Sequence, residues 1–158
     1  MQELNKDNKI NILLSALEER YNSLSTIRER THNIGIWSLG ILLGASGWLI
    51  ESGITLSILE KKLYLVGIII AFIILRFHYL KDLQVGFRSQ QRITVKIEKA
   101  LHLFDQGFFD DSEESIYPKS WEKSGTKDGK GKFFETNFAL LYIGMIFLII
   151  SIITNGCL

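Results

Sequence analysis

The chain has 158 residues, enough for one domain, of which 47% are hydrophobic and 22% are charged. Its formal net charge of +1 gives no electrostatic case for nucleic-acid binding. A single cysteine, Cys157, excludes an internal disulfide framework and a zinc site built on cysteines. Charged residues are absent from three stretches of the chain and concentrated between them, so its apolar and charged parts are segregated.

Residues 1–32 have the periodicity of an amphipathic helix. Apolar side chains recur every three or four residues, and charged side chains occupy much of the remaining surface. The apolar positions are Ile10, Leu13, Leu14, Leu17, Tyr21, Leu24 and Ile27. No proline or glycine precedes Gly35, so the helix can continue into the first apolar segment. Its apolar stripe needs a partner, either the same helix of another subunit or the helix that follows the second apolar segment.

Three segments are apolar enough to cross a bilayer as helices. They are about 33–50, 63–80 and 133–158. A crossing of the hydrocarbon core needs about 20 residues, and Thr31–Ile50 and Thr136–Leu158 carry no formal charge. Leu63–Leu75 is too short alone and becomes long enough by including Arg76 and His78, since an arginine near a helix end can extend to the headgroup level. The alternative for this middle segment is a buried helix of a soluble protein.

The distribution of basic residues predicts the orientation. Of the 18 Lys and Arg residues, all except Lys61 and Lys62 lie before the first segment or in the second loop and its flanks. By the positive-inside rule, these parts are expected in the cytoplasm and the C-terminus outside, for a protein of the cell inner membrane. The predicted fold is all-α. Its parts are a cytoplasmic helix (1–32), a transmembrane hairpin (33–80), a cytoplasmic helix with a flexible loop (81–132) and a third transmembrane helix (133–158).

A second amphipathic helix is predicted to continue from the second span, from Tyr79 to about Phe104. Basic side chains recur along it, at Arg88, Arg92, Lys96 and Lys99. Like charges at this spacing repel by a few tenths of a kcal/mol per pair, so a counter-charge is expected. The basic face predicts a site for anionic lipid headgroups or a nucleotide, or else a solvated face that follows the positive-inside bias. The acidic run from Asp105 to Glu114 is a further source of counter-charge, and 124–132 has the composition of a flexible linker.

No motif predicts an enzyme, a metal site or a cofactor. Gly125–Lys132 resembles a phosphate-binding loop but lacks its spacing, its Ser or Thr after the lysine and its preceding strand. His32, His78 and His102 are far apart in sequence and fit no metal motif. His32 and His78 are either a proton-sensitive pair or ordinary interfacial histidines. Cys157 is either a free thiol or part of an intersubunit disulfide.

Small residues share one face of the first span. Gly40 and Gly44 form a GxxxG motif that Gly47 continues, and Gly67 and Ala71 have the same spacing in the second span. Because such residues let helix backbones approach closely in lipid, this face predicts either a subunit interface or packing among the spans of one chain. No span contains an acidic residue, which disfavours a coupled transporter and makes a homo-oligomer around a pore the easier arrangement. The candidates for a weakly polar pore lining are Ser38, Ser46, Asn137 and Ser151.

The order of these elements resembles the SLATT-type domains, small bacterial membrane proteins of antiviral and nucleotide-signalled conflict systems. The likeness is architectural and covers roughly residues 10–106, and the third span is an addition to the two-span pattern. It implies a pore-forming effector that opens as an oligomer when a cytoplasmic protein or a nucleotide triggers it, so that depolarisation halts growth of an infected cell. The alternative is a non-conducting membrane anchor or scaffold whose cytoplasmic helices recruit a soluble partner.

Overall fold

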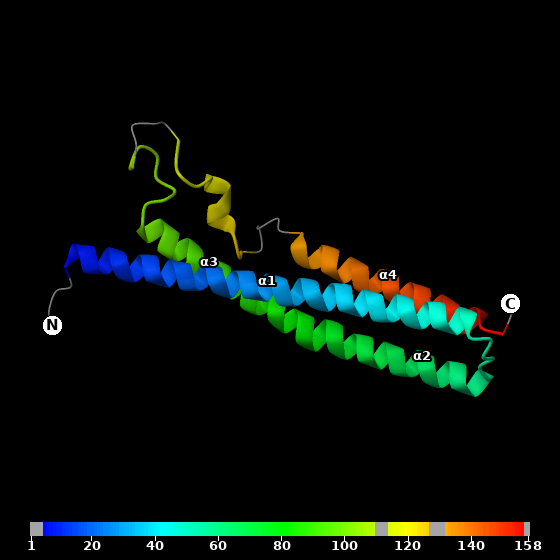
Figure 1. Cartoon of the computed structure of the whole chain (residues 1–158). Helices are drawn as coiled ribbons and strands as arrows, with labels where there is room; N and C mark the ends of the chain where they lie inside the picture. The colour runs from blue at the N-terminus through cyan, green and yellow to red at the C-terminus, as the bar shows by residue number, and fades with distance from the viewer. Residues whose placement is uncertain (1–4, 110–113, 127–131, 157–158) are drawn as a thin grey trace. The chain divides into compact units, whose positions relative to one another are not determined.

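The computed structural model describes residues 5–109, 114–126 and 132–156, and in these ranges the chain is helical with no β-strand. The elements in order are α1 (Lys6–Glu51), α2 (Ile58–Ile73), the π-helix η1 (Ile74–Tyr79), α3 (Leu80–Ala100), the 3₁₀-helix η2 (Lys119–Lys123) and α4 (Phe133–Thr154) (Figure 1). Among the described residues, three helical runs are long and apolar enough to cross a membrane: α1, Ile58–Ala100 and α4. The all-helical class and the three apolar helices are thereby confirmed.

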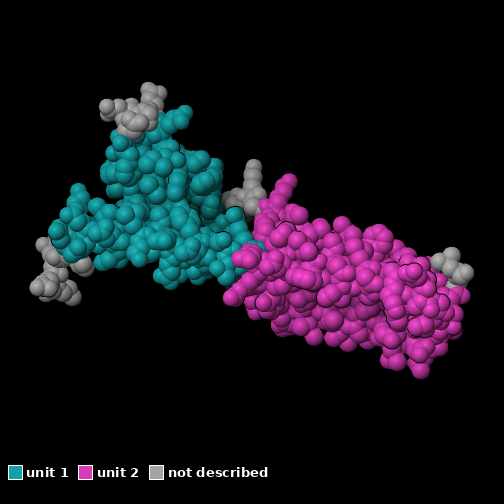
Figure 2. Space-filling model, viewed as in Figure 1, with its two compact units in different colours: residues 1–28, 84–131 teal, residues 29–83, 132–158 magenta. Residues whose placement is uncertain are grey.

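The chain divides into two compact units (Figure 2). Unit 1 comprises residues 1–28 and 84–131, and unit 2 comprises residues 29–83 and 132–158. The single helix α1, 46 residues long, contributes its first part to unit 1 and the rest to unit 2. Its continuity agrees with the absence of helix-breaking residues before Gly35.

In unit 1, part of the apolar stripe of α1 packs against α3, one of the two partners that the sequence allows. Leu17 of α1 is buried, as are Phe87 and Val95 of α3. Two side-chain hydrogen bonds join the helices, since Arg20 donates to Gln90 at 2.8 Å and Tyr21 donates to Glu98 at 2.6 Å. The stripe of α1 is therefore covered only in part within unit 1, because Ile10 and Leu14 stay exposed.

The helix after the second apolar segment ends earlier than its apolar periodicity predicts. α3 stops at Ala100, although Leu101 and Phe104 continue the apolar pattern. His102 takes a left-handed conformation with φ of 60°, which closes the last turn, and the N–H of Leu103 bonds back to the carbonyl of Glu98. The predicted end near Phe104 is thus four residues too late, because the pattern reports burial and not backbone conformation.

In unit 2, α4 is the most buried of the apolar helices. Nine of its residues are buried, whereas none of α2, which the structure describes in full, is buried. α4 lies along α1, where an added Cβ at Gly144 would come within 2.9 Å of Leu42 and one at Gly35 within 2.7 Å of Asn137 Oδ1. It also meets α2, where the rings of Phe72 and Tyr142 lie 5.3 Å apart. The close approach of α4 to α1 thus depends on Gly35 and Gly144.

A polar clasp joins the helix ends at the far end of unit 2. The side-chain oxygen of Asn155 accepts a hydrogen bond from the N–H of Leu56 at 2.7 Å, and its nitrogen donates to the carbonyls of Ile54 and Leu49 at 2.8 and 3.2 Å. Lys61 donates to the carbonyls of Ile153 and Asn155. The last carbonyls of α4 therefore find donors, and the α1–α2 connection is tied to them.

Candidate functional site

A short segment of unit 1, residues 114–126, lies over α3, and we refer to it as the strap. Its Tyr117 N–H donates to the carbonyl of Leu103 at 2.9 Å, and the Tyr117 ring contacts Phe104 at 5.9 Å and Trp121 at 5.5 Å between centroids. Glu122 forms an ion pair with Lys99 at 2.9 Å. Hydrogen bonds, rings and one ion pair thus hold the strap.

The far end of the strap is fixed at Gly125. Its carbonyl accepts a hydrogen bond from Arg92 Nε at 2.8 Å, and its φ of +77° favours glycine. A Cβ at this position would lie 2.6 Å from the Arg88 carbonyl oxygen and 2.9 Å from the Arg92 nitrogen. Since both neighbours are backbone atoms of α3, only glycine fits the observed contact.

The strap occupies part of the predicted basic face. Arg92 donates a hydrogen bond to the strap, and Lys99 forms an ion pair with Glu122 of the strap. Glu122 thus supplies a counter-charge that the sequence analysis expected from the acidic run. Arg88 and Lys96 are exposed and form no ion pair with any described residue. Asp105 pairs with His102 at 2.6 Å, and Asp110, Asp111 and Glu113 lie outside the described residues. An anion site on Arg88 and Lys96 stays a prediction.

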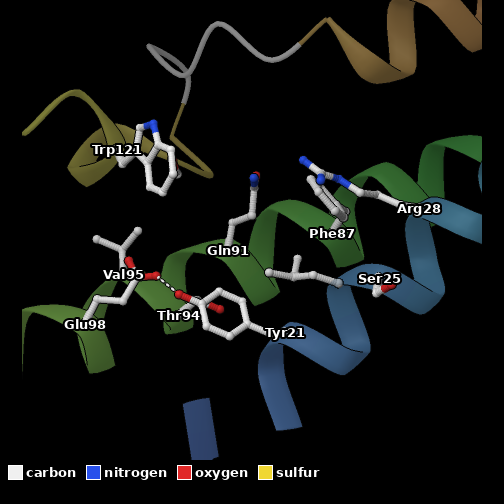
Figure 3. Close-up of a pocket in the computed structure, with 11 residues that line it drawn as sticks. Tyr21, Ser25, Arg28, Phe87, Gln91, Thr94, Val95, Glu98 and Trp121 are labelled. Atoms are coloured by element: carbon white, nitrogen blue, oxygen red, sulfur yellow. Dashed lines mark hydrogen bonds between the residues drawn. The ribbon is translucent and has the colours of Figure 1, made fainter. Parts of the chain in front are cut away.

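Between α1, α3 and the strap lies a pocket of about 540 Å³ (Figure 3). Arg28 and Phe87 lie at one end of it and Tyr21 and Glu98 at the other, while Trp121 faces α3 from the strap. Its polar lining residues are Ser25, Arg28, Gln91, Thr94, Glu98 and Ser124. The volume is in the range of small-molecule sites, and the lining combines aromatic walls with one cation and one anion.

The two ends of the pocket differ in charge. Glu98 is only 5% exposed and accepts a hydrogen bond from the Tyr21 hydroxyl, which also lies 3.2 Å from the hydroxyl of Tyr117. Burial and the bond to Glu98 raise the pKa of Tyr21 above its ordinary value, so the phenol stays neutral and donates. At the other end, the Arg28 guanidinium lies 5.5 Å from the centre of the Phe87 ring. The pocket thus suits a polar ligand with a donor at one end and an acceptor at the other.

The small-residue face of the spans faces outward from unit 2. An added Cβ at Gly40, Gly44, Gly47 or Gly67 would meet no described atom within 4 Å, and Ala71 is exposed. Packing within the chain therefore does not occupy the GxxxG motif in this structure. A subunit interface on these residues stays a prediction.

The residues considered for a pore lining are placed differently. Ser46, Asn137 and Ser151 are buried in unit 2, while Ser38 is partly exposed. Ser46 and Ser151 donate to the carbonyls of Leu42 and Phe147, four residues earlier, as these groups do in apolar helices. A pore lined by the three buried residues would require α4 to move relative to its neighbours.

Other sequence candidates stay apart or lie outside the described residues. His32 and His78 are both exposed, and no hydrogen bond or ring contact joins them. Cys157 lies outside the described ranges, as does most of the glycine-rich linker. No group of three His, Cys, Asp or Glu side chains in the described part of the chain is arranged to hold a metal ion.

No protein-family model, curated protein or solved structure matches this chain. The sequence interpretation did not identify the pocket, the strap contacts or the Asn155 clasp. The sequence contains two signals of these contacts. Tyr21 places a hydroxyl within an apolar stripe, and Gly125 lies in a segment that otherwise has the composition of a linker. Each signal indicates a contact only when the distant residue that it contacts is known.

Proposed function

We propose that the protein is a multi-pass inner-membrane protein that acts as an oligomeric effector and is triggered through unit 1. In this proposal unit 1 is cytoplasmic, unit 2 lies in the bilayer and the C-terminus is outside. The three apolar helices and the segregation of basic residues support this arrangement. The bilayer and further copies of the chain are its partners, and the proposal includes no catalytic step.

The observation that carries the proposal is the open glycine face of α1. Gly40, Gly44 and Gly47 form a strip of small residues on which no described part of the same chain packs. Exposed Trp37 and Trp48 lie on the same helix and suit the two headgroup regions. A second copy that packs on this strip would gain backbone proximity, which is the main source of helix association in lipid.

The trigger in this proposal acts on unit 1, through the pocket or the surface of the strap. The strap continues through residues 127–131 into α4, so a partner that displaces Trp121 or Gly125 acts on the chain only a few residues from the third span. The resemblance to SLATT-type domains supports a pore that depolarises the membrane during antiviral defence. A protein or a nucleotide is the expected class of trigger.

Expression in bacteria with a membrane-potential dye tests the effector function, and crosslinking in membranes tests the interface. We expect wild-type protein to depolarise cells and to form crosslinked oligomers, and Gly44→Leu to lose both while still inserting. The control is Ile41→Phe, which adds bulk at an exposed position about a quarter turn from the strip.

Unchanged crosslinking in Gly44→Leu would show that the interface lies elsewhere. Harmless accumulation of wild-type oligomers would instead favour the second candidate, a non-conducting scaffold that recruits a soluble partner. The open pocket and the strap are the observations that favour this candidate, since both offer contact surface without a channel.

A further inference from the structure

Arg76 of unit 2 has a buried Nε with no polar partner among the described residues. Arg76 lies in the π-helix η1, and its guanidinium carbon is 3.6 Å from the centre of the Phe138 ring on α4. Phe138 is 6% exposed, so its position is fixed by packing. The ring therefore holds the guanidinium plane in place, as cation–π contacts with arginine do.

The hydrogen-bonding groups of Arg76 are unsatisfied. Its Nε is buried without an acceptor, and the side chain makes no hydrogen bond or ion pair with any residue that the structure describes. A guanidinium carries five N–H donors and stays charged in proteins. Leaving such donors unmet away from water is costly, so an acceptor from outside the chain is expected.

Two measurements along the helices place Arg76 just inside the apolar region. The uncharged stretch Leu63–Leu75 is only about 20 Å long at 1.5 Å per residue, shorter than the roughly 30 Å hydrocarbon core. On α4, Phe138 lies about 4–5 Å beyond Glu135, the last charged residue before the span. If Lys62 marks one boundary of the core, the first count leaves the Arg76 backbone about 10 Å from the other boundary, whereas the second count gives about 4–5 Å. A long arginine side chain can extend over such a distance to the headgroups, where phosphate is the abundant anion.

Arg76 is the third residue of the π-helix η1. In η1 the N–H of Leu80 bonds to the carbonyl of Leu75, five residues earlier, so this hydrogen-bonded turn encloses one more residue than a turn of an α-helix. The wider turn changes the direction of the side chains within it relative to α2. Single π-turns inside longer helices occur frequently at binding sites.

We propose that Arg76, held against Phe138, binds the phosphate of an anionic phospholipid in the cytoplasmic leaflet. Arginine pairs with phosphate through two parallel N–H bonds, and the cytoplasmic leaflet supplies anionic headgroups. The exposed carboxylates of Asp82 and Glu135 make no bond to Arg76. The inference rests on the proposed membrane insertion and orientation but needs neither an oligomer nor a pore.

The test uses the full-length protein in mild detergent, with phosphatidylglycerol as the probe. Native mass spectrometry counts retained lipids, and thermal unfolding reports protection over a titration of the lipid. We expect Arg76→Gln to weaken phosphatidylglycerol binding about tenfold or more, because a charge-assisted pair is lost. The matched control is Lys81→Gln, which removes an exposed positive charge away from the ring and should retain wild-type binding.

Two further variants keep the test valid if Arg76→Gln folds poorly. Arg76→Lys keeps the charge but loses the planar stack, and Phe138→Leu keeps Arg76 but removes the ring, so both should give intermediate binding. Equal losses of phosphatidylglycerol binding in Arg76→Gln and Lys81→Gln, or no loss of binding in either variant, would overturn the proposed site. Protection by inorganic phosphate that matches phosphatidylglycerol and depends on Arg76 would overturn the lipid assignment. A water-soluble, detergent-free wild-type protein would instead overturn membrane insertion.

Discussion

The two units of the chain are stabilised in opposite ways. Unit 1 places a carboxylate, phenols and guanidinium groups between two helices and a strap, as in the contact of Tyr21 with Glu98. Unit 2 packs apolar and small residues along α4 and confines its polar contacts mainly to the helix ends, as at Asn155. The difference matches the two solvents of the proposed arrangement, in which water would supply missing hydrogen bonds around unit 1 and a bilayer could not do so around unit 2. Substitutions should therefore act through polar groups and turn geometry in unit 1, and through packing in unit 2.

The largest effect is expected for Gly125→Ala in unit 1. The new Cβ meets two backbone atoms of α3 and the residue has positive φ, so the strap cannot keep its contact. We expect unit 1 to lose more than about 2 kcal/mol of stability, or the strap to detach. Limited proteolysis within 114–126 and the fluorescence of Trp121 report detachment.

A matched glycine makes this prediction specific. Gly86 lies within α3, and an added Cβ there meets no described atom within 4 Å. Gly86→Ala should therefore stabilise the helix by about 0.5–1 kcal/mol, which is the usual gain of alanine over glycine. If Gly125→Ala and Gly86→Ala changed stability alike, the assigned contact of Gly125 with the backbone of α3 would be wrong.

The next effect tests the polar end of unit 2. Asn155→Ala removes one acceptor and two donor interactions with the α1–α2 connection. We expect a loss of about 2–3 kcal/mol, because the backbone groups left behind are partly buried. Thermal unfolding in detergent measures it, and Asn33→Ala, at an exposed position within α1 of unit 2, serves as the control. An unchanged unfolding midpoint of Asn155→Ala would mean that water replaces the hydrogen bonds of the Asn155 side chain.

A smaller effect separates the inward and outward glycines of α1. Gly35→Ala brings a Cβ to within 2.7 Å of Asn137 Oδ1, so the buried Asn137 side chain or α4 must shift, and about 1–2 kcal/mol should be lost. Gly40→Ala has open space and should leave the unfolding midpoint of the isolated chain at or above that of wild type. The reverse order of the two variants would show that α4 packs on the other face of α1.

Local patterns predicted the parts of this fold that depend on local chemistry. The continuity of α1 up to Gly35 follows from the lack of proline and glycine there, and the three apolar helices follow from runs without charge. The capping box at Ser57 and Glu60 is equally local, and the structure forms both of its hydrogen bonds. These features need no knowledge of distant residues.

The candidate site depends on contacts between residues that are far apart in sequence. Tyr21 and Glu98 are separated by 77 residues, and Arg92 reaches Gly125 across 33. Neither pairing has a periodic signature, because each joins one polar residue to another across a tertiary contact. The π-turn at Arg76 is similarly unmarked, since its sequence reads as a continuous helix. The basic face was identified in the sequence, but its contacts with the strap were not.

The smallest effect concerns the pH dependence of unit 1. Because the pKa of Tyr21 is raised in the folded chain, its stabilising contribution is complete below the ordinary phenol pKa of about 10 and declines as the pH rises above it. Tyr21→Phe removes this decline, and at pH 7 it should cost only about 1 kcal/mol, since the ring is partly exposed. Unfolding of wild type and variant between pH 7 and 11 gives the comparison, and Tyr64→Phe, in α2 of unit 2, is the control. If the stability of Tyr21→Phe declined at alkaline pH as much as that of wild type, another group would cause the decline. The bond from Tyr21 to Glu98 would then not distinguish unit 1 from unit 2.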